Sequence, residues 1–312
     1  MPTPFLHKLA FWFLGFSLLG AAACRRDAPA MPQPQPAVFP QPAPAMSPPP
    51  NFASLPSPSI GFGTAIPRGV APAVSARAAI VVHANSGQVL FAKNADVRYP
   101  VASTQKLLTG LILAEAGNLS KSVHVSASDT YVEPTKLGLR SGDVYRKEAL
   151  LRAMLVKSCN DIARCLARDH SGSESAFAQV MNQKAASLGM TNSHFANASG
   201  LPASGQYSTA RDLSILATAA MRNSFVRQCV GTRALTFTLA NGSTTVLRTT
   251  NKVLERCSFC TGMKTGTTNA AGRCLVSSGS NGGKNVIVVV LGSTSANVWN
   301  ESEALLRWGL GL

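Results

Sequence analysis

The chain has 312 residues, of which 46% are hydrophobic, and its formal net charge is +15. This length and apolar content are ample for the buried core of one large or two small domains. The 29 Lys and Arg residues are scattered, with no basic helix and no basic patch interleaved with aromatics, so we expect no nucleic-acid partner. A diffuse basic surface suits an anionic surrounding such as a cell wall or an outer leaflet, and it serves equally well as a solubility feature.

The N-terminal segment has the features of an export signal. An apolar run, Leu9–Leu19, is too short to stay in a membrane as a spanning helix, and Ala21-Ala22-Ala23 supplies the small residues of a cleavage site. We therefore predict a signal peptide over residues 1–23 and a protein located in the periplasm or cell envelope. Cys24 follows directly, as the lipidated cysteine of a bacterial lipoprotein does, although Ala21 stands where such sites usually carry Leu. Lipid anchoring through Cys24 and simple removal of the leader both stay open.

The next segment is rich in proline. Fourteen of the 19 prolines lie between Pro29 and Pro72, mixed with Ala, Gln and Ser. Such a stretch cannot bury enough apolar surface to offset the entropy lost on ordering. We predict a disordered linker over residues 24–74 that tethers a catalytic domain over residues 75–312.

The domain is predicted to begin with a β-hairpin and a helix. Residues 78–83 and 88–92 form two short strand patterns around the turn Asn85-Ser86-Gly87. An apolar periodic stretch over residues 107–116 follows, which places Ser103 at the N-terminus of a helix.

The middle of the domain is predicted to be helical and its end to be rich in strands. Helical patterns cover 147–156, 161–170, 175–188, 209–221 and 300–308, and strand patterns cover 235–239, 244–247, 262–267, 274–278 and 285–292. Strands at both ends with helices between them indicate an α/β (α+β) fold, in which one antiparallel sheet carries a helical insert.

Six cysteines follow Cys24 in the chain: Cys159, Cys165, Cys229, Cys257, Cys260 and Cys274. In an exported protein this even number suggests disulfides, although the sequence does not choose among the pairings. The pair Cys257-x-x-Cys260 lacks a second pair of ligands at zinc-site spacing, and the histidines occur singly. We therefore predict no metal site and no cofactor.

Three short polar motifs carry the chemical signal. They are Ser103-Thr104-Gln105-Lys106, Ser158-Cys159-Asn160 and Lys264-Thr265-Gly266, and the first and third are unique in the chain. Their order and spacing match serine enzymes that cleave peptidoglycan stem peptides and are acylated by penicillin.

The first motif pairs a nucleophile with a base. A serine hydroxyl attacks an amide poorly unless a base removes its proton, and Lys106 is the nearest candidate to Ser103. A lysine acts as a base only if its pKa falls, which burial or a neighbouring cation such as Lys264 would cause. The helix start at Ser103 also favours a developing oxyanion.

The other two motifs suit substrate binding. Gly266 on an edge strand leaves room for a substrate backbone, and the ammonium of Lys264 with the hydroxyls of Thr265 and Thr267 could hold a carboxylate. Ser158 and Asn160 would point into the same cleft. Taken alone, that last pair is equally what a helix N-cap requires.

From about residue 76 to residue 310 the chain resembles the low-molecular-mass D-alanyl-D-alanine carboxypeptidase family of penicillin-binding proteins. Segments beyond the motifs share the likeness: Ala84–Leu90, Pro100–Ser103, Leu188–Asn192, Gly200–Pro202, Tyr207–Leu213 and Asn300–Glu303. The resemblance implies the D,D-peptidase/serine β-lactamase-like fold and peptidoglycan stem peptides ending in D-Ala-D-Ala as substrate, with β-lactams as acylating ligands.

The resemblance also implies roles for the site residues. Ser103 would be the acylated nucleophile and Lys106 its general base. Ser158 and Asn160 would relay a proton and bind the substrate amide, and Lys264 and Thr265 would contact the carboxylate. The oxyanion hole would be the backbone N–H groups of Ser103 and Thr267.

Two departures from the family pattern matter. Family carboxypeptidases commonly carry an arginine shortly before the Asn-Glu-Ser-Glu segment, but residues 295–299 here contain none. This leaves open a D,D-endopeptidase that cuts cross-links, unless Arg273 takes the arginine's place. Many relatives also have a C-terminal β-rich domain and a membrane-binding helix, whereas this chain ends at Leu312. We therefore expect an anchor at the N-terminal end, with membrane contact only through Cys24.

Two rivals are weaker. A class A β-lactamase carries its deacylating glutamate after the Ser-x-Asn motif, whereas Glu133 precedes that motif here. A non-catalytic wall-binding lipoprotein would have no need of a base beside the serine. The intact set of motifs therefore favours an enzyme.

Overall fold

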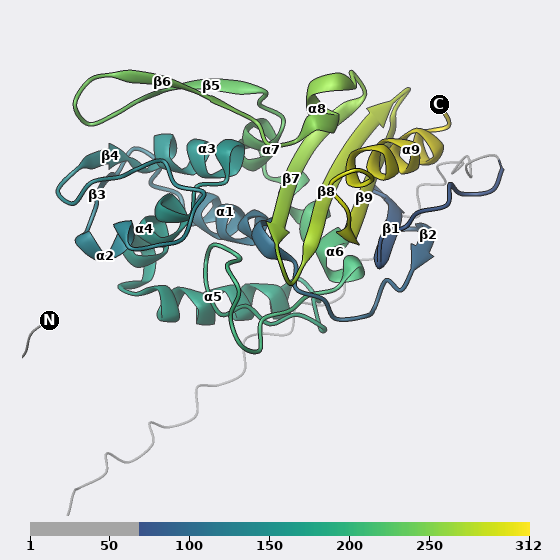
Figure 1. Ribbon diagram of the computed structural model, residues 1–312, viewed down its shortest axis with the longest axis horizontal. Helices are drawn as coiled ribbons and strands as arrows, with labels where there is room; N and C mark the ends of the chain where they lie inside the picture. Colours follow the sequence, from purple (N-terminus) through teal and green to yellow (C-terminus); the bar gives the residue numbers. More distant parts are fainter. Residues whose placement is uncertain (1–68) are drawn as a thin grey trace, which may run out of the picture. The chain divides into compact units, whose positions relative to one another are not determined.

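The computed structural model describes residues 69–312, and it builds them around a five-stranded antiparallel sheet (Figure 1). The predicted signal peptide, Cys24 and most of the predicted linker lie outside the described residues. The strand order is β2-β1-β9-β8-β7. The strands are β1 (Ala78–His83), β2 (Val89–Lys93), β7 (Cys260–Thr268), β8 (Gly272–Asn281) and β9 (Lys284–Ser293). The predicted sheet, assembled from the two ends of the domain, is confirmed, and β7 is one of its edges.

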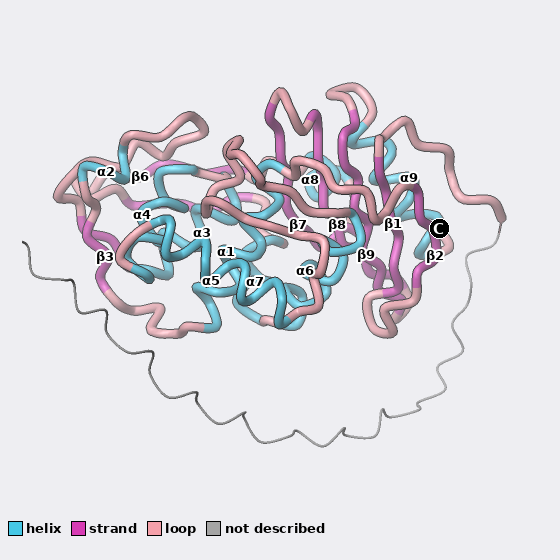
Figure 2. Tube along the Cα trace, turned by 90° about the horizontal axis from the view of Figure 1, so that it is seen from below, coloured by secondary structure: helices cyan, strands magenta, loops and turns pink. Residues whose placement is uncertain are grey.

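Helices cover one face of the sheet and form the helical insert (Figure 2). They are η1 (Ala102–Gln105), α1 (Lys106–Glu115), α2 (Ala127–Thr130), α3 (Lys147–Lys157), α4 (Asn160–Ser171), α5 (Glu174–Ser187), α6 (Ala210–Arg222) and α7 (Ser224–Val230). The central one is α1, whose residues from Lys106 to Leu113 are all buried. Because α1 is packed on all sides, the motif at its start is held on a rigid element.

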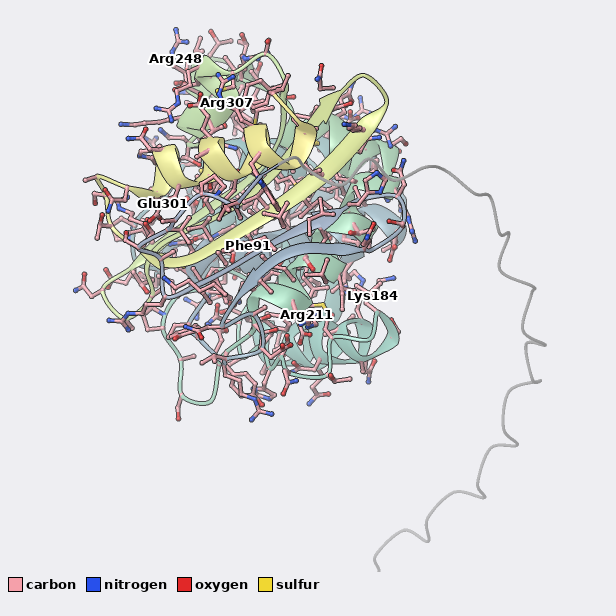
Figure 3. All side chains as sticks on the ribbon, turned by 90° about the vertical axis from the view of Figure 1, so that its right-hand side faces the viewer. Phe91, Lys184, Arg211, Arg248, Glu301 and Arg307 are labelled. Atoms are coloured by element: carbon pink, nitrogen blue, oxygen red, sulfur yellow. The ribbon has the colours of Figure 1, made fainter. Side chains whose placement is uncertain are left out.

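One helix, α9 (Val298–Leu310), covers the opposite face of the sheet (Figure 3). Its residue Trp308 meets Phe91 of β2 edge-on, with 6.5 Å between the ring centroids. Its Glu301 accepts hydrogen bonds from the backbone and hydroxyl of Ser75 and from the hydroxyl of Ser293. Burial opposes ionisation of Glu301, but these hydrogen bonds outweigh it and lower its pKa. The carboxylate thus joins the start of the domain to its last strand and helix.

Two small hairpins and a short helix complete the fold. The hairpins are β3 (Ser122–His124) with β4 (Val144–Arg146) and β5 (Ala234–Thr238) with β6 (Thr244–Arg248), and the helix is α8 (Lys252–Arg256). The β5–β6 strands were predicted, whereas β3, β4, α2, α7 and α8 were not. These missed elements have three to seven residues, too few for a hydrophobic period to show.

The expectation of disulfides is wrong for the described residues, because all six of their cysteines are buried free thiols. Cys165, Cys229, Cys260 and Cys274 lie in α4, α7, β7 and β8, and Cys159 and Cys257 cap the ends of α4 and α8. Each fills the core as a small apolar side chain. Burial raises the pKa of Cys159 to about 12 and that of Cys274 to about 11, so both thiols stay protonated. Within residues 69–312, every helix is too short or too polar to cross a membrane.

Candidate active site

The turn that carries Ser103 is fixed by two close backbone contacts. Ser103 lies in the η1 turn, and Lys106 is the first residue of α1. A Cβ on Gly200 would come within 2.1 Å of the Ala102 carbonyl oxygen, and one on Gly266 within 3.0 Å of the Ser103 nitrogen. Gly266 was expected to make room for substrate, and here it makes room for the nucleophile's own turn. The glycine lets β7 lie directly against η1.

Lys106 is fully buried beneath Ser103 and has three oxygen partners. Its Nζ lies 3.1 Å from the Ser103 Oγ, 2.6 Å from the Asn160 Oδ1 and 2.6 Å from the Ser199 carbonyl oxygen. Burial first, and the charge of Lys264 second, hold the pKa of Lys106 well below its ordinary value. A buried ammonium is costly, so the neutral amine is favoured.

The partners of a neutral Lys106 leave only one role for Ser103. A neutral amine has two N–H groups and one lone pair. The Ser199 carbonyl can only accept, and the Asn160 Oδ1 can only accept as well, so these two take both N–H groups. The lone pair is then left for the O–H of Ser103. This is the arrangement of a base that is ready to take the serine proton.

The orientation of the Asn160 amide is set by its other end. Its Nδ2 donates to the carbonyl oxygens of Glu133 and Pro134, each at 3.0 Å. Two acceptors on that side require the amide nitrogen there, so the Oδ1 must face Lys106. The loop between α2 and β4 therefore determines which atom of Asn160 faces the lysine.

The helix-cap interpretation of Ser158 and Asn160 is wrong. Ser158 ends α3 in the left-handed region, with φ of 70°. Cys159 is the N-cap residue of α4 and makes no side-chain cap bond, while Asn160 is already inside the helix. Both polar side chains are therefore free of capping and face the cleft.

Lys264 lies buried beside Ser158 and donates a hydrogen bond to its hydroxyl oxygen. Its Nζ donates to the Ser158 Oγ at 2.8 Å and to the Thr265 carbonyl at 3.1 Å, and only 1% of the residue is exposed. Burial lowers the pKa of Lys264 to about 7. Because Lys264 donates a hydrogen bond to the Ser158 Oγ, the O–H of Ser158 is free to donate to a group in the cleft.

The recognition side of the cleft is formed by β7 and β8. The Thr265 and Thr250 hydroxyls lie 2.6 Å apart. Arg273 of β8 donates from Nη1 to the Thr267 Oγ1 at 3.1 Å and from Nε to the Ser295 Oγ at 2.9 Å. Ser295 belongs to the segment in which the expected arginine is missing, so a guanidinium reaches this segment from β8 instead.

These residues enclose one cleft of about 420 Å³. Ser103, Ser158, Asn160, Thr265, Gly266 and Thr267 line it, while Lys106 and Lys264 lie buried beneath it. Every candidate residue from the three motifs is thus brought together. The sequence did not identify Ser199 as a partner of Lys106, or Thr250 and Trp299 as lining residues of the cleft. The segments beginning at Gly200 and Asn300 were the signals near Ser199 and Trp299.

The glutamate of the β-lactamase rival does not reach the cleft. Glu133 contributes its backbone carbonyl to Asn160, while the residue lines a separate cavity together with Arg164 and Glu174. The described residues contain no group of three or more His, Cys, Asp or Glu side chains that could hold a metal ion. The candidate catalytic groups are Lys106, which contacts Ser103, with Asn160 bonded to Lys106, and Ser158 of the same cleft, with Lys264 bonded to Ser158.

Comparisons with known proteins agree with this geometry. The model of the D-alanyl-D-alanine carboxypeptidase family (peptidase S11) matches residues 67–295. The D-alanyl-D-alanine carboxypeptidase DacB2 of Mycobacterium tuberculosis is 32% identical over 231 residues, which cover 72% of this chain and 79% of that protein. The D-alanyl-D-alanine endopeptidase of Escherichia coli is 36% identical over 197 residues, covering 61% and 62% respectively. The crystal structure of a D-alanyl-D-alanine carboxypeptidase from M. tuberculosis superimposes with a TM-score of 0.75 at 32% identity, covering 78% of this chain and 94% of that chain.

Proposed function

We propose that this chain, which belongs to the D-alanyl-D-alanine carboxypeptidase family of serine peptidases, removes the terminal D-alanine of peptidoglycan stem peptides through an acyl-enzyme at Ser103. The observation that carries the proposal is the set of partners around Lys106, which leaves its lone pair for the Ser103 hydroxyl. The family is one of serine hydrolases that bind penicillin, and the same acylation would make β-lactams inhibitors of this protein.

Acylation begins with transfer of the Ser103 proton to the Nζ of Lys106 as the oxygen attacks the D-Ala carbonyl. The ammonium that forms already has two hydrogen-bonded oxygens, from Asn160 and Ser199. The backbone N–H groups of Ser103 and Thr267 would stabilise the oxyanion. The N–H of Ser103 lies at the start of the η1 turn, where it has no intrahelical acceptor, and that of Thr267 lies on the edge strand β7.

Expulsion of D-alanine needs a proton on its nitrogen, and Ser158 is placed to give it. Lys264 donates to the Ser158 Oγ, so the Ser158 proton is directed away from that lysine. As this proton moves to the leaving amine, an N–H of Lys264 stabilises the oxygen left behind, and Lys264 molecules that carry the third proton can return it to Ser158. Water then hydrolyses the ester by the reverse order of proton transfers.

Binding of the terminal carboxylate falls to the recognition side of the cleft. Thr265 and Thr267 offer hydroxyls, and Arg273 offers a guanidinium bonded to Thr267. A planar guanidinium binds a carboxylate through two hydrogen bonds better than a lone ammonium does. Arg273 therefore supports the carboxypeptidase function despite the missing arginine at residues 295–299.

A D,D-endopeptidase that cuts peptidoglycan cross-links is the second candidate. It is favoured by the absence of arginine from residues 295–299 and by the likeness to the E. coli endopeptidase. Initial rates on monomeric pentapeptide and on cross-linked dimers, measured side by side, separate the two functions. Efficient trimming of the monomer alone supports the carboxypeptidase, and faster cleavage of the dimer makes the endopeptidase the main activity.

We also propose that the protein is exported and acts in the periplasm or cell envelope, held there by a lipid on Cys24. The support is the leader pattern before Cys24 and the proline-rich segment after it. Mass spectrometry of the protein from membranes should show acyl chains on its N-terminal peptide, and Cys24→Ser should release the protein into the soluble fraction. A mature N-terminus without lipid would contradict the anchor but leave the enzymatic proposal intact.

A further inference from the structure

A second cavity lies at the opposite end of β7 from the Ser103 turn. Its volume is about 440 Å³, and α6, α7, the strands β7–β9 and the β1–β2 turn contribute its walls. Thr261, near the start of β7, lines this cavity, whereas Gly266 and Thr267, near the end of the same strand, line the catalytic cleft. The two sites share a strand and have no lining residue in common.

Two arginines make the cavity cationic. They are Arg222, the last residue of α6, and Arg227 of α7. Neither forms an ion pair with any residue that the structure describes. Arg227 donates to the Met221 carbonyl at 2.8 Å, which holds it beside the opening. Two guanidinium groups at one opening favour an oxyanion, because their planar N–H groups match its oxygens in pairs.

A partly buried hydroxyl pair, Thr261 and Ser278, lines the cavity, and its remaining proton has no strong acceptor when it stays on Ser278. Ser278 is 3% exposed, and its Oγ lies 2.7 Å from the Thr261 Oγ1 and 3.8 Å from the Met221 sulfur. One of the two hydroxyls donates to the other, so one proton of the pair remains. If it belongs to Ser278, its other partner is a thioether, which is a weak acceptor. A ligand oxygen in the cavity would satisfy this proton.

The rest of the lining is mixed. The Met221, Val286 and Ile287 side chains supply apolar surface, while Thr218 and Asn85 add polar groups. A sugar ring has the same mixture, with C–H groups on its faces and hydroxyls on its edge, and a carboxylate or phosphate on the sugar would meet the arginines. We propose that this cavity binds an oxyanion, either a carboxylate or a phosphate monoester, carried on a sugar. The proposal does not rest on the function proposed for Ser103.

Calorimetric titration of the purified protein with three probes tests the proposal. N-acetylmuramic acid carries a carboxylate on an amino sugar, N-acetylglucosamine has the same ring without it, and glucose 1-phosphate carries a phosphate. We expect N-acetylmuramic acid or glucose 1-phosphate to bind at least about tenfold more tightly than N-acetylglucosamine, because charged hydrogen bonds are strong. If N-acetylmuramic acid binds more tightly, the cavity prefers a carboxylate, and if glucose 1-phosphate does, it prefers a phosphate. Equal binding of the two supports recognition of the oxyanion that they share.

Variants locate the binding. Arg222→Ala and Arg227→Ala should each weaken binding of the acidic sugar about tenfold, and Ser278→Ala should weaken it less. Arg248→Ala is the matched control, because Arg248 is an exposed arginine on β6 that lines neither site (Figure 3). Equal losses in Arg248→Ala would mean that net charge alone attracts the ligand and would overturn the proposal, as would equal affinity for all three probes. Penicillin labelling of Ser103 should be unchanged in all four variants, so a failure here is distinguishable from a failure of the proposed catalytic function.

Discussion

The two sides of the catalytic cleft differ in their exposure to water. On the reaction side, Lys106 and Lys264 are 0% and 1% exposed, and both have lowered pKa values. On the recognition side, Arg273 is only half-buried, and its partners are exposed hydroxyls. Burial makes a lysine a useful base, whereas a guanidinium keeps its charge in any surrounding and can stay near water. Proton transfer therefore calls for buried lysines, whose pKa values fall, and carboxylate binding calls for an arginine, which can stay half-exposed.

The largest effect should come from the nucleophile. Ser103→Ala removes the only atom that can form the ester, so we expect no penicillin adduct and no measurable release of D-alanine. Intact-protein mass spectrometry after penicillin treatment is the measurement, with Ser295→Ala as the control that retains the adduct. A persisting adduct in Ser103→Ala would move the nucleophile to another residue.

Lys106→Arg should be almost as damaging, because it keeps a cation but removes the base. A guanidinium stays protonated, so it cannot take the serine proton. We expect acylation by penicillin to slow by about 100- to 10,000-fold, the usual contribution of a general base. In the wild type the acylation rate should rise with pH until Lys106 is neutral and then level off. Near-normal acylation by Lys106→Arg would show that Lys264 or Ser158 acts as the base.

The recognition side should respond in KM rather than in chemistry. Arg273→Ala should raise the KM for a substrate ending in a free D-Ala carboxylate about 10- to 100-fold, because a charged hydrogen bond is lost. The same peptide with a C-terminal amide should be little affected, and Arg273→Lys should fall between. Equal losses on acid and amide would assign Arg273 a structural role and remove the support it gives to the carboxypeptidase.

These two sides were not equally visible in the sequence. The reaction side was predicted residue by residue, because its chemistry is carried by short motifs whose members are neighbours in the chain. The recognition side was predicted only in part. The role of Arg273 depends on the register that pairs it with Thr267 across β7 and β8, and on the loop that brings Ser295 to it.

Local patterns failed where tertiary contacts decide the outcome. Ser158 and Asn160 match a helix cap, but the loop carbonyls of Glu133 and Pro134 hold the Asn160 amide toward Lys106 instead. The even number of cysteines suggested disulfides, but the fold distributes the thiols through the core. Ser199 offers only its backbone to Lys106, so no residue type could have marked it.

The smallest effect we predict concerns stability. It tests whether Lys264, on the reaction side, is as well shielded from water as its burial implies. Unfolded Lys264 keeps its proton up to its ordinary pKa of 10.5, whereas in the folded protein the pKa is lowered to about 7. Between these values the unfolded chain binds more protons, so the free energy of unfolding should rise with pH. The rise due to this one group is about 1.4 kcal/mol per pH unit above pH 7.

Urea unfolding of the wild type and of Lys264→Met between pH 7 and 8.5 isolates this contribution. The window stops there because the buried cysteines, whose pKa values are raised, titrate only in the unfolded chain at higher pH and reverse the trend. The slope should be shallower in Lys264→Met than in the wild type by about 1.4 kcal/mol per pH unit, while Lys252→Met, which changes a lysine at the rim of the cleft, should keep the wild-type slope. Identical slopes in all three proteins would mean that Lys264 stays charged in the folded state over this pH range, and the Ser158 oxygen would then accept its hydrogen bond from a full ammonium.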